Sequence, residues 1–216
     1  MGRQRSLKES QPEFSSKELV VGAYIYLVFE IGIANITFQK IADRAGIAFS
    51  TVRYYMTDDD FDIHAEAFKR VMARSLDYVE KRSSHGNRQG RFNPIHDYVD
   101  SMFDWISDDR ANSTYLIYAY YTASSELRTN VDLSDVNKNA RDKVQRSLLE
   151  AIGLELYNPV SDAHTCALSV HACVVGHGFL AMTAGTQEAF KTYRIACRSV
   201  IDALMSDFLR VSQAIS

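Results

Sequence analysis

The segment "ITFQKIADRAGIAFSTVRYYM", residues 36 to 56, decides the fold, because it encodes two short helices joined by a tight turn. Thr37 precedes the first helix, where its hydroxyl can accept a hydrogen bond from a free backbone amide of the first turn. Gly46 ends that helix, and glycine readily adopts the left-handed conformation that such a turn needs. The second helix is predicted to begin at Ala48 and to end near Tyr55. The pattern therefore predicts a helix-turn-helix.

The two faces of this motif carry different side chains. Ile41, Ile47 and Val52 are predicted to face inward and to fix the angle between the helices. A second helix held in this way can enter the major groove of DNA, which is about 12 Å wide. The outward residues predicted to reach the groove are Phe49, Ser50, Arg53 and Tyr54. Thr37 and Lys40 are predicted to lie near phosphates, through a hydroxyl, helix amides and an ammonium group.

The longer segment "VVGAYIYLVFEIGIANITFQKIADRAGIAFSTVRYYM" resembles the N-terminal domain of TetR-type transcriptional regulators. The residues that carry the resemblance are Phe29, Gly32, Thr37, Ile41, Ala42, Ala45, Gly46, Ile47, Thr51 and Tyr55. The resemblance implies an all-α homodimer that binds operator DNA and whose C-terminal helical domain binds a small-molecule effector, typically as a repressor. The DNA-binding residues that we predict from the outward face and the resemblance together are Thr37, Lys40, Phe49, Ser50, Thr51, Arg53, Tyr54 and Tyr55.

The segment also departs from the family's pattern in ways that bear on DNA binding. The family usually has Ser or Thr at the position of Ala48, Tyr at that of Arg53 and Phe at that of Met56. It commonly has Lys at the position of Asp59, where the side chain contacts a phosphate. Between residues 32 and 66 the sequence has three basic side chains against six acidic ones. Because affinity for DNA comes largely from neutralising phosphates, this region is poorly equipped for binding.

The acidic run after the motif has a structural explanation as well. Thr57 followed by Asp60 is typical of a capping box, which predicts that Thr57 caps a long helix running to about residue 81. Carboxylates in a first turn complement the helix dipole, but Asp58, Asp59 and Asp60 still repel phosphate. Two interpretations therefore stay open. The chain either binds DNA through Arg53, Lys40, Tyr54 and the basic arm, with the acids turned aside, or is a homodimer of the same fold with weakened or lost DNA binding that acts through another protein.

The remaining sequence predicts further helices. Only 3 Pro and 10 Gly occur in 216 residues, and 46% of the residues are hydrophobic, which favours long helices around a substantial core. A first helix is predicted over residues 15–32 and a loop over residues 83–94. Later helices are predicted over residues 94–107, 111–128, 133–153, 160–184 and 187–212. The predicted division is a flexible basic arm (1–14), a helix-turn-helix domain of three helices (15–57) and a helical effector-binding and dimerisation domain (58–216).

The charge of the chain limits its contact with nucleic acid. A net charge of -3 and a pI of about 6.1 exclude a strongly basic, DNA-coating protein, so any DNA contact must be local. Arg3, Arg5 and Lys8 in the arm can add phosphate contacts. An odd number of cysteines, no secretory segment and no uninterrupted apolar run of about 18 residues predict a cytoplasmic protein without a membrane span.

The segment "DYVDSMFDWISDDRANSTYLIYAYYTASSEL", residues 97 to 127, is unusually rich in aromatic side chains. Aromatic walls with a few hydroxyls suit a small, flat or apolar effector. The candidate ligand-binding residues are Tyr98, Met102, Phe103, Trp105, Tyr115, Tyr118, Tyr121 and His171. Ordinary core packing is the alternative, and tyrosines at adjacent helix positions cannot all face one cavity.

The last two predicted helices are candidates for a dimer interface. Phe190, Tyr193, Leu204 and Phe208 belong to a long apolar stripe on the last helix, beside a mostly apolar helix before it. Such a pair is typical of the two helices that each copy contributes to a four-helix interface. Burial of the stripe within one subunit is the alternative.

No metal site, cofactor or catalytic site is predicted. His164 and His171 lie seven residues apart, as do Cys166 and Cys173, and two helical turns separate such pairs by about 10 Å, too far for one ion. The sequence has no glycine-rich phosphate loop, serine elbow or HExxH motif, so an enzyme is not expected.

Overall fold

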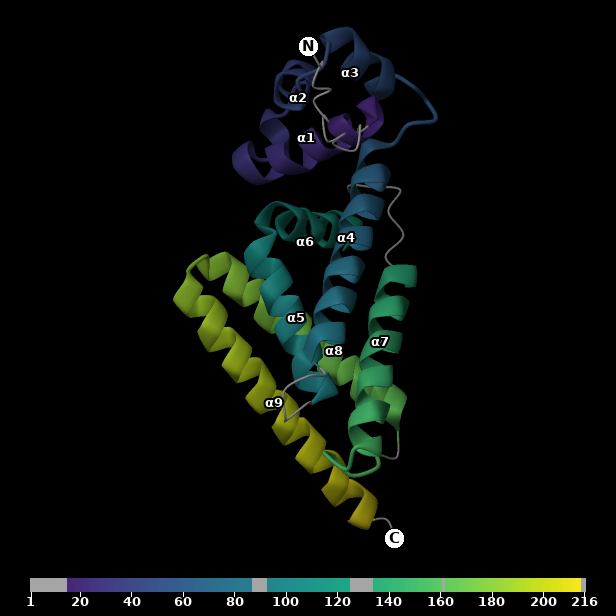
Figure 1. The fold of residues 1–216 in the computed structure, drawn as a ribbon, viewed down its shortest axis with the longest axis vertical. Coiled ribbons are helices and arrows are strands. Elements are labelled where there is room, and N and C mark those ends of the chain that lie inside the picture. The colour runs from purple at the N-terminus through teal and green to yellow at the C-terminus, as the bar shows by residue number, and fades with distance from the viewer. Residues whose placement is uncertain (1–14, 87–92, 125–133, 161, 215–216) are drawn as a thin grey trace, which may run out of the picture.

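A computed structural model of the chain describes residues 15–86, 93–124, 134–160 and 162–214, and all regular structure in these ranges is helical (Figure 1). The elements are α1 (Ser16–Ile31), the 3-10 turn η1 (Ile33–Asn35), α2 (Phe38–Ala45), α3 (Phe49–Met56), α4 (Ile63–Gly86), α5 (Pro94–Asp108), α6 (Arg110–Ser124), α7 (Ser134–Gly153), α8 (Ala163–Ala184) and α9 (Gln187–Ala214). The predicted all-α class is confirmed. The predicted basic arm (1–14) and the end of the predicted helix 111–128 lie outside the described residues.

Local sequence signals build the helix-turn-helix formed by α2 and α3. The Thr37 hydroxyl accepts a hydrogen bond from the Lys40 amide at 3.3 Å and caps α2. Gly46 ends α2 with φ 67° and ψ 31°, in the left-handed region that glycine adopts without steric cost. Ala48 precedes α3 and makes no side-chain capping bond. Val52 is fully buried, so α3 lies against α1 and α2 as the pattern predicts.

The prediction that Thr57 caps α4 is wrong. Thr57 follows α3, and its hydroxyl donates a hydrogen bond to the carbonyl oxygen of Arg53 at 2.8 Å. Helix α4 begins at Ile63, where the Asp62 carboxylate accepts hydrogen bonds from two backbone amides of the first turn at 2.8 and 3.1 Å. A capping side chain must directly precede its helix, and a turn of several residues separates Thr57 from α4.

The boundary between α4 and α5 also differs from the prediction. Helix α4 continues to Gly86 instead of ending near residue 81, because the serines at positions 83 and 84 do not break a helix as proline does. Helix α5 begins at Pro94, which is favoured in a first turn. The Asn93 side chain caps α5 by accepting hydrogen bonds from the amides of Ile95 and His96 at 3.0 and 3.3 Å.

The arrangement of the helices places α1, α2 and α3 at one end of an elongated molecule (Figure 1). Helix α1 packs against both α4 and α6, and α5 packs against α4, α7, α8 and α9. Figure 1 shows α4 running from the α1–α3 end down the length of the molecule. The largest fully buried side chains belong to α5 and α6: Phe103, Trp105 and Tyr115. The core of the molecule therefore lies between the helix-turn-helix end and the α8–α9 pair.

Helix α8 is the one helix, in the part of the chain that the structure describes, with the length and mean hydropathy of a segment that could cross a membrane. It packs against α7, α5 and α9. Its residues Cys166, Ala167, Val170 and Val174 are buried in the core. The core helix of a protein without a membrane span has the same composition, so we assign this apolarity to packing.

Candidate functional site

The outer face of α3 is open to solvent. Tyr54 is 67% exposed and Phe49 is 43% exposed, and Ser50 and Arg53 are exposed as well. Helix α3 lies at the end of the molecule opposite the C terminus (Figure 1). The four side chains predicted to enter the major groove therefore share an accessible surface.

Two of the predicted DNA-binding residues of α3 are less exposed than the other four predicted to enter the groove. Thr51 and Tyr55 are half-buried. The Tyr55 ring contacts the Phe61 ring with centroids 5.5 Å apart and meets the Tyr54 ring edge-on at 5.4 Å. Tyr55 thus holds the exposed Tyr54 in position, and it packs α3 against the loop before α4.

The three basic side chains near the motif differ in the partners that they contact. The Lys40 ammonium group, at the start of α2, donates a hydrogen bond to the Asn35 carbonyl at 2.8 Å. Arg44 forms an ion pair with Glu30 at 2.9 Å. Arg53 is exposed, and its guanidinium group forms no ion pair with any residue that the structure describes. Arg53 is therefore the basic side chain best placed to bind an external anion.

The acidic run divides into two structural carboxylates and two exposed ones. The Asp58 side chain accepts a hydrogen bond from the Asp60 amide at 3.1 Å, which closes the turn after α3. Asp62 caps α4. Asp59 and Asp60 are exposed in the segment between α3 and α4. The negative charge that would face a DNA backbone therefore comes mainly from these two residues.

A mostly apolar cavity of about 610 Å³ lies among α4, α5, α6, α7 and α8. Five of the eight predicted ligand-binding residues line it: Tyr98, Met102, Trp105, Tyr121 and His171. Other residues that line the cavity were not predicted, among them Met72, Leu76 and Val79 on α4, and Leu116, Asn139, Lys143, Phe179 and Met182 on the other helices. The spacing of residues 72, 76 and 79 along one face of α4 is the sequence signal for this wall.

The other three predicted ligand-binding residues lie outside the cavity lining. Phe103 is fully buried, and the Arg194 guanidinium lies 5.9 Å from its ring centroid. Tyr115 is buried, and its hydroxyl donates a hydrogen bond to the His64 carbonyl at 3.1 Å. The Tyr118 ring lies 5.9 Å from the Tyr115 ring. These three side chains belong to the core or to the contact between α4 and α6.

Polar groups in the cavity are few. Among the lining residues that the structure describes, Lys143 carries the only formal positive charge, and burial lowers its pKa. Burial also lowers the pKa of His171, and the nearby Arg141 lowers it further. His171 is therefore neutral at pH 7. A ligand of this cavity would be mainly apolar, with one acceptor or anionic group directed at Lys143.

Comparison with solved structures gives several matches over nearly the whole chain. A TetR transcription regulator from Haloarcula marismortui matches with a TM-score of 0.69 at 19% identity, over 87% of this chain and 97% of that one. SmeT, the repressor of the Stenotrophomonas maltophilia multidrug efflux pump SmeDEF, matches with a TM-score of 0.61 at 21% identity, over 89% and 90%. This chain has the TetR fold. No protein-family model matches the sequence, and no curated protein matches it.

In this example of the TetR fold, an aromatic cluster joins the helix-turn-helix end to the cavity end. The Tyr24 hydroxyl on α1 lies 3.2 Å from Nδ1 of His64 on α4. The Tyr24 ring also meets the Tyr115 ring of α6, with centroids 6.1 Å apart. His64 lies in the first turn of α4, and the same helix lines the cavity further along its length. Helix α4 therefore contacts α1 near one end and lines the cavity further along.

Low pH is expected to lower the stability of the folded chain through protonation of His64. Burial lowers the pKa of His64, and the Asp62 carboxylate opposes this only in part. An unfolded histidine takes up a proton near pH 6.5, whereas the buried one does so only at lower pH, so the stability present at neutral pH falls as the pH drops below about 6.5. We expect the His64→Gln variant to lose less stability between about pH 7 and pH 5 than the original chain.

Urea unfolding at a series of pH values measures this difference. His164→Gln is the matched control, because His164 is exposed at the start of α8. An equal pH slope in His64→Gln and in the original chain would show that His64 is not held neutral by the fold.

Proposed function

We propose that the chain is a cytoplasmic DNA-binding transcriptional regulator, a repressor that a small apolar or aromatic effector releases from its operator. Residues 15–57 would bind DNA, and residues 58–216 would bind the effector and form a homodimer. The observation that carries the proposal is the exposed face of α3, whose Arg53 forms no ion pair with a described residue, joined by α4 to a cavity of about 610 Å³. Catalysis is not part of the proposal, because the sequence contains no motif for it.

The proposed roles at the DNA follow from exposure. Phe49, Ser50, Arg53 and Tyr54 would enter the major groove, with Arg53 making the charged contact to a base edge or a phosphate. Thr37 and Lys40, at the exposed start of α2, would contact the DNA backbone. Thr51 and Tyr55 would hold α3 in place rather than touch DNA.

The proposed homodimer uses the outer faces of α8 and α9. Exposed apolar side chains gather on these two helices: Leu168, Leu180, Ile195 and Val200, with Val175 and Phe179 exposed at the cavity lining beside them. Exposed apolar residues in such number on adjacent helices are typical of a protein interface. We assign this face to a second copy of the chain. A two-fold interface places the same surface on both partners, so each copy would cover the apolar face of the other. The dimer would then present two α3 helices to successive half-sites about 34 Å apart.

The proposed effector is apolar with one polar group. The cavity walls are mostly aliphatic and aromatic, and Lys143 and neutral His171 offer a charge and a hydrogen bond. One of the structures similar to this chain is a complex of SmeT with triclosan, at 21% identity and a TM-score of 0.58. That likeness supports a small-molecule ligand without indicating which one binds here.

The proposed mechanism is a change in the distance between the two recognition helices. An effector against Met72, Leu76 and Val79 would shift α4 along the cavity wall. The contact of His64 with Tyr24 would carry that shift to the helix-turn-helix. A dimer whose α3 helices no longer match the half-site spacing binds DNA more weakly, although no base-reading residue has changed.

Recovery of DNA from the organism's own genome tests the proposal. Genomic fragments are titrated against the purified chain at low salt, and bound fragments are sequenced, with the mass of the chain measured by light scattering. A dimer that selects a few fragments, with affinity that falls steeply as salt rises, is expected. Absence of any bound fragment at micromolar protein would reject the regulator function.

A second candidate function follows from the exposed carboxylates. Asp59 and Asp60 lie beside the recognition helix, and their charge opposes the approach of phosphate. The chain could then be a dimer of the same fold whose partner is a protein that binds this acidic end. Binding of DNA by the original chain distinguishes the two functions.

Replacing Asp59 with lysine is expected to raise the affinity for DNA. If this exposed position faces a phosphate, the new ammonium group makes one more backbone contact, and the slope of log affinity against log salt steepens by about 1. Asp142→Lys on α7 is the matched control, since it makes the same change of net charge at an exposed position far along the chain. Equal affinities for the Asp59→Lys and Asp142→Lys variants would show that Asp59 points away from DNA.

A further inference from the structure

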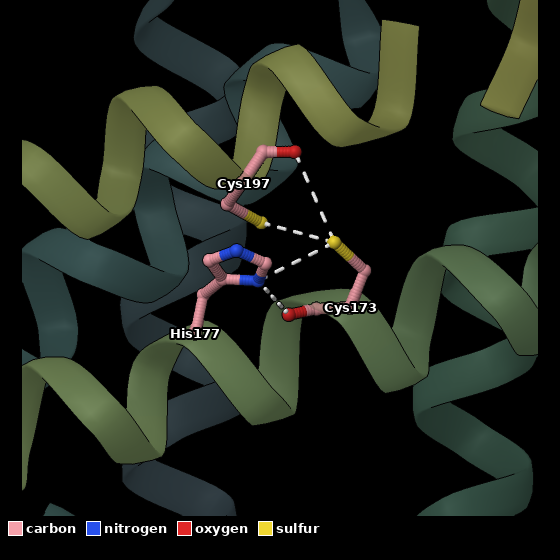
Figure 2. Close-up of side chains that lie close together, drawn as sticks. All are labelled: Cys173, His177 and Cys197. Carbon is pink, nitrogen blue, oxygen red and sulfur yellow. Dashed lines mark hydrogen bonds between the residues drawn. The ribbon is translucent and has the colours of Figure 1, made fainter. Parts of the chain in front are cut away.

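Three metal-binding side chains meet where α8 packs against α9 (Figure 2). Cys173 and His177 lie four residues apart on α8, so one turn brings them to the same face. Cys197 reaches them from α9. The sequence predicts no metal site because its His and Cys pairs at seven-residue spacing lie too far apart, and the exact packing of α9 on α8 is what brings Cys197 to Cys173 and His177.

Two of the three donor distances within this Cys173–His177–Cys197 cluster match those of a metal site. The Cys173 Sγ atom lies 3.8 Å from the Cys197 Sγ atom and 3.5 Å from His177 Nδ1. All three donor atoms lie within 4.8 Å of one another. Tetrahedral coordination by zinc places two thiolate sulfurs about 3.8 Å apart, and a sulfur and a nitrogen about 3.5 Å apart, given bonds of about 2.3 and 2.0 Å.

We propose that Cys173, His177 and Cys197 bind one thiophilic metal ion, of the zinc(II) class, between α8 and α9. Two sulfur donors and one imidazole donor favour such an ion over magnesium or calcium, which prefer oxygen. Cys173 and His177 are only half-buried, so an ion has access to the cluster and solvent can supply a fourth ligand.

Proton transfers accompany the binding. His177 Nδ1 lies 2.9 Å from the Cys173 carbonyl oxygen and donates a hydrogen bond to it, because a carbonyl oxygen only accepts. Metal binding moves that proton to the other ring nitrogen and exchanges the carbonyl bond for a metal bond. Counted from two thiols and a neutral imidazole, one divalent ion enters and two thiol protons leave to solvent.

The expected consequence of metal binding is that α8 and α9 are held together. Helix α8 lines the cavity, and α8 and α9 together carry the exposed apolar face. An ion held by both helices would restrict their relative movement and stabilise the folded chain by an amount that grows with the logarithm of its affinity. The metal site does not depend on DNA binding, so failure of the metal-binding test would leave the proposed regulator function intact, and the reverse also holds.

Cobalt(II) absorption tests the site directly. The reduced, metal-free full chain is titrated with Co²⁺, and thiolate-to-cobalt charge-transfer absorption is recorded, followed by displacement with Zn²⁺ and thermal unfolding with and without Zn²⁺. Variants Cys173→Ser, Cys197→Ser and His177→Gln are compared with two controls outside the cluster, Cys166→Ser and His164→Gln. Circular dichroism checks that each variant is folded.

The expected result is one Co²⁺ per chain with a charge-transfer band that Zn²⁺ abolishes, together with a higher melting temperature in Zn²⁺. The band should be lost in Cys173→Ser and Cys197→Ser, weakened in His177→Gln and unchanged in both controls. Absence of the band in the reduced original chain would overturn the proposal. So would an undiminished band in Cys173→Ser, which is the decisive variant because Cys197 is fully buried and its replacement can disturb packing.

Discussion

Replacing Phe103 with alanine is expected to lower the free energy of unfolding by about 3–5 kcal/mol. Phe103 is fully buried in α5, where its ring contacts the Arg194 guanidinium, and it does not line the cavity. The variant loses the buried ring and leaves a void among close-packed helices. Chemical denaturation followed by circular dichroism measures the loss.

Two companion variants make this prediction sharper. Phe103→Leu keeps most of the apolar volume and is expected to cost less than about 1.5 kcal/mol. Phe49→Ala removes a ring that is 43% exposed on α3 and is expected to change stability by less than about 0.5 kcal/mol. Equal losses for Phe103→Ala and Phe49→Ala would contradict the burial of Phe103, and would return it to the candidate ligand-binding residues.

The second large effect is expected in DNA binding. Arg53→Ala removes the exposed guanidinium of α3 that pairs with no described residue, and should weaken operator binding by about 1–3 kcal/mol, or about 5- to 150-fold. The physical reason is the loss of the charge-assisted contact that Arg53 is proposed to make in the major groove. Titration of a recovered genomic fragment at several salt concentrations measures the change.

The salt dependence shows which kind of contact is lost. A base contact of Arg53 would give a loss confined to the selected sequence, whereas a phosphate contact would weaken all sequences and reduce the salt slope by about 1. Lys81→Ala is the control, because Lys81 has the same charge, lies in the distant half of α4 and forms a surface ion pair with Asp77. Unchanged binding by Arg53→Ala would show that α3 does not read DNA through this residue.

The acidic residues after α3 show that a local sequence pattern need not identify the residue that caps a helix. Thr57 and Asp60 have the spacing of a capping box, yet Asp62 caps α4, because the path of the chain after α3 places a turn between them. The sequence shows that a carboxylate cap is available but not which carboxylate occupies it. That choice separates the structural Asp58 and Asp62 from the exposed Asp59 and Asp60.

The cavity shows a similar division. The richness of α5 and α6 in aromatic residues predicted a ligand site in these helices. The structure places a cavity there, and Met102 lines it while its neighbour Phe103 lies in the core. Adjacent residues on a helix point about 100° apart, so the rotation of α5 against its neighbours decides which one meets a ligand. Lys143 was not among the predicted cavity residues, because nothing near it in the sequence distinguishes it from a surface lysine.

The sequence by itself determined the helices and the helix-turn-helix, because caps and turns act within a few residues. Thr37 bonds an amide three positions away, and Gly46 bends the chain at its own backbone. Only the tertiary structure decided which residues of distant helices meet. The three donor atoms of Cys173, His177 and Cys197 come together because α9 folds back along α8, and α9 also packs against α5, which is distant in the sequence.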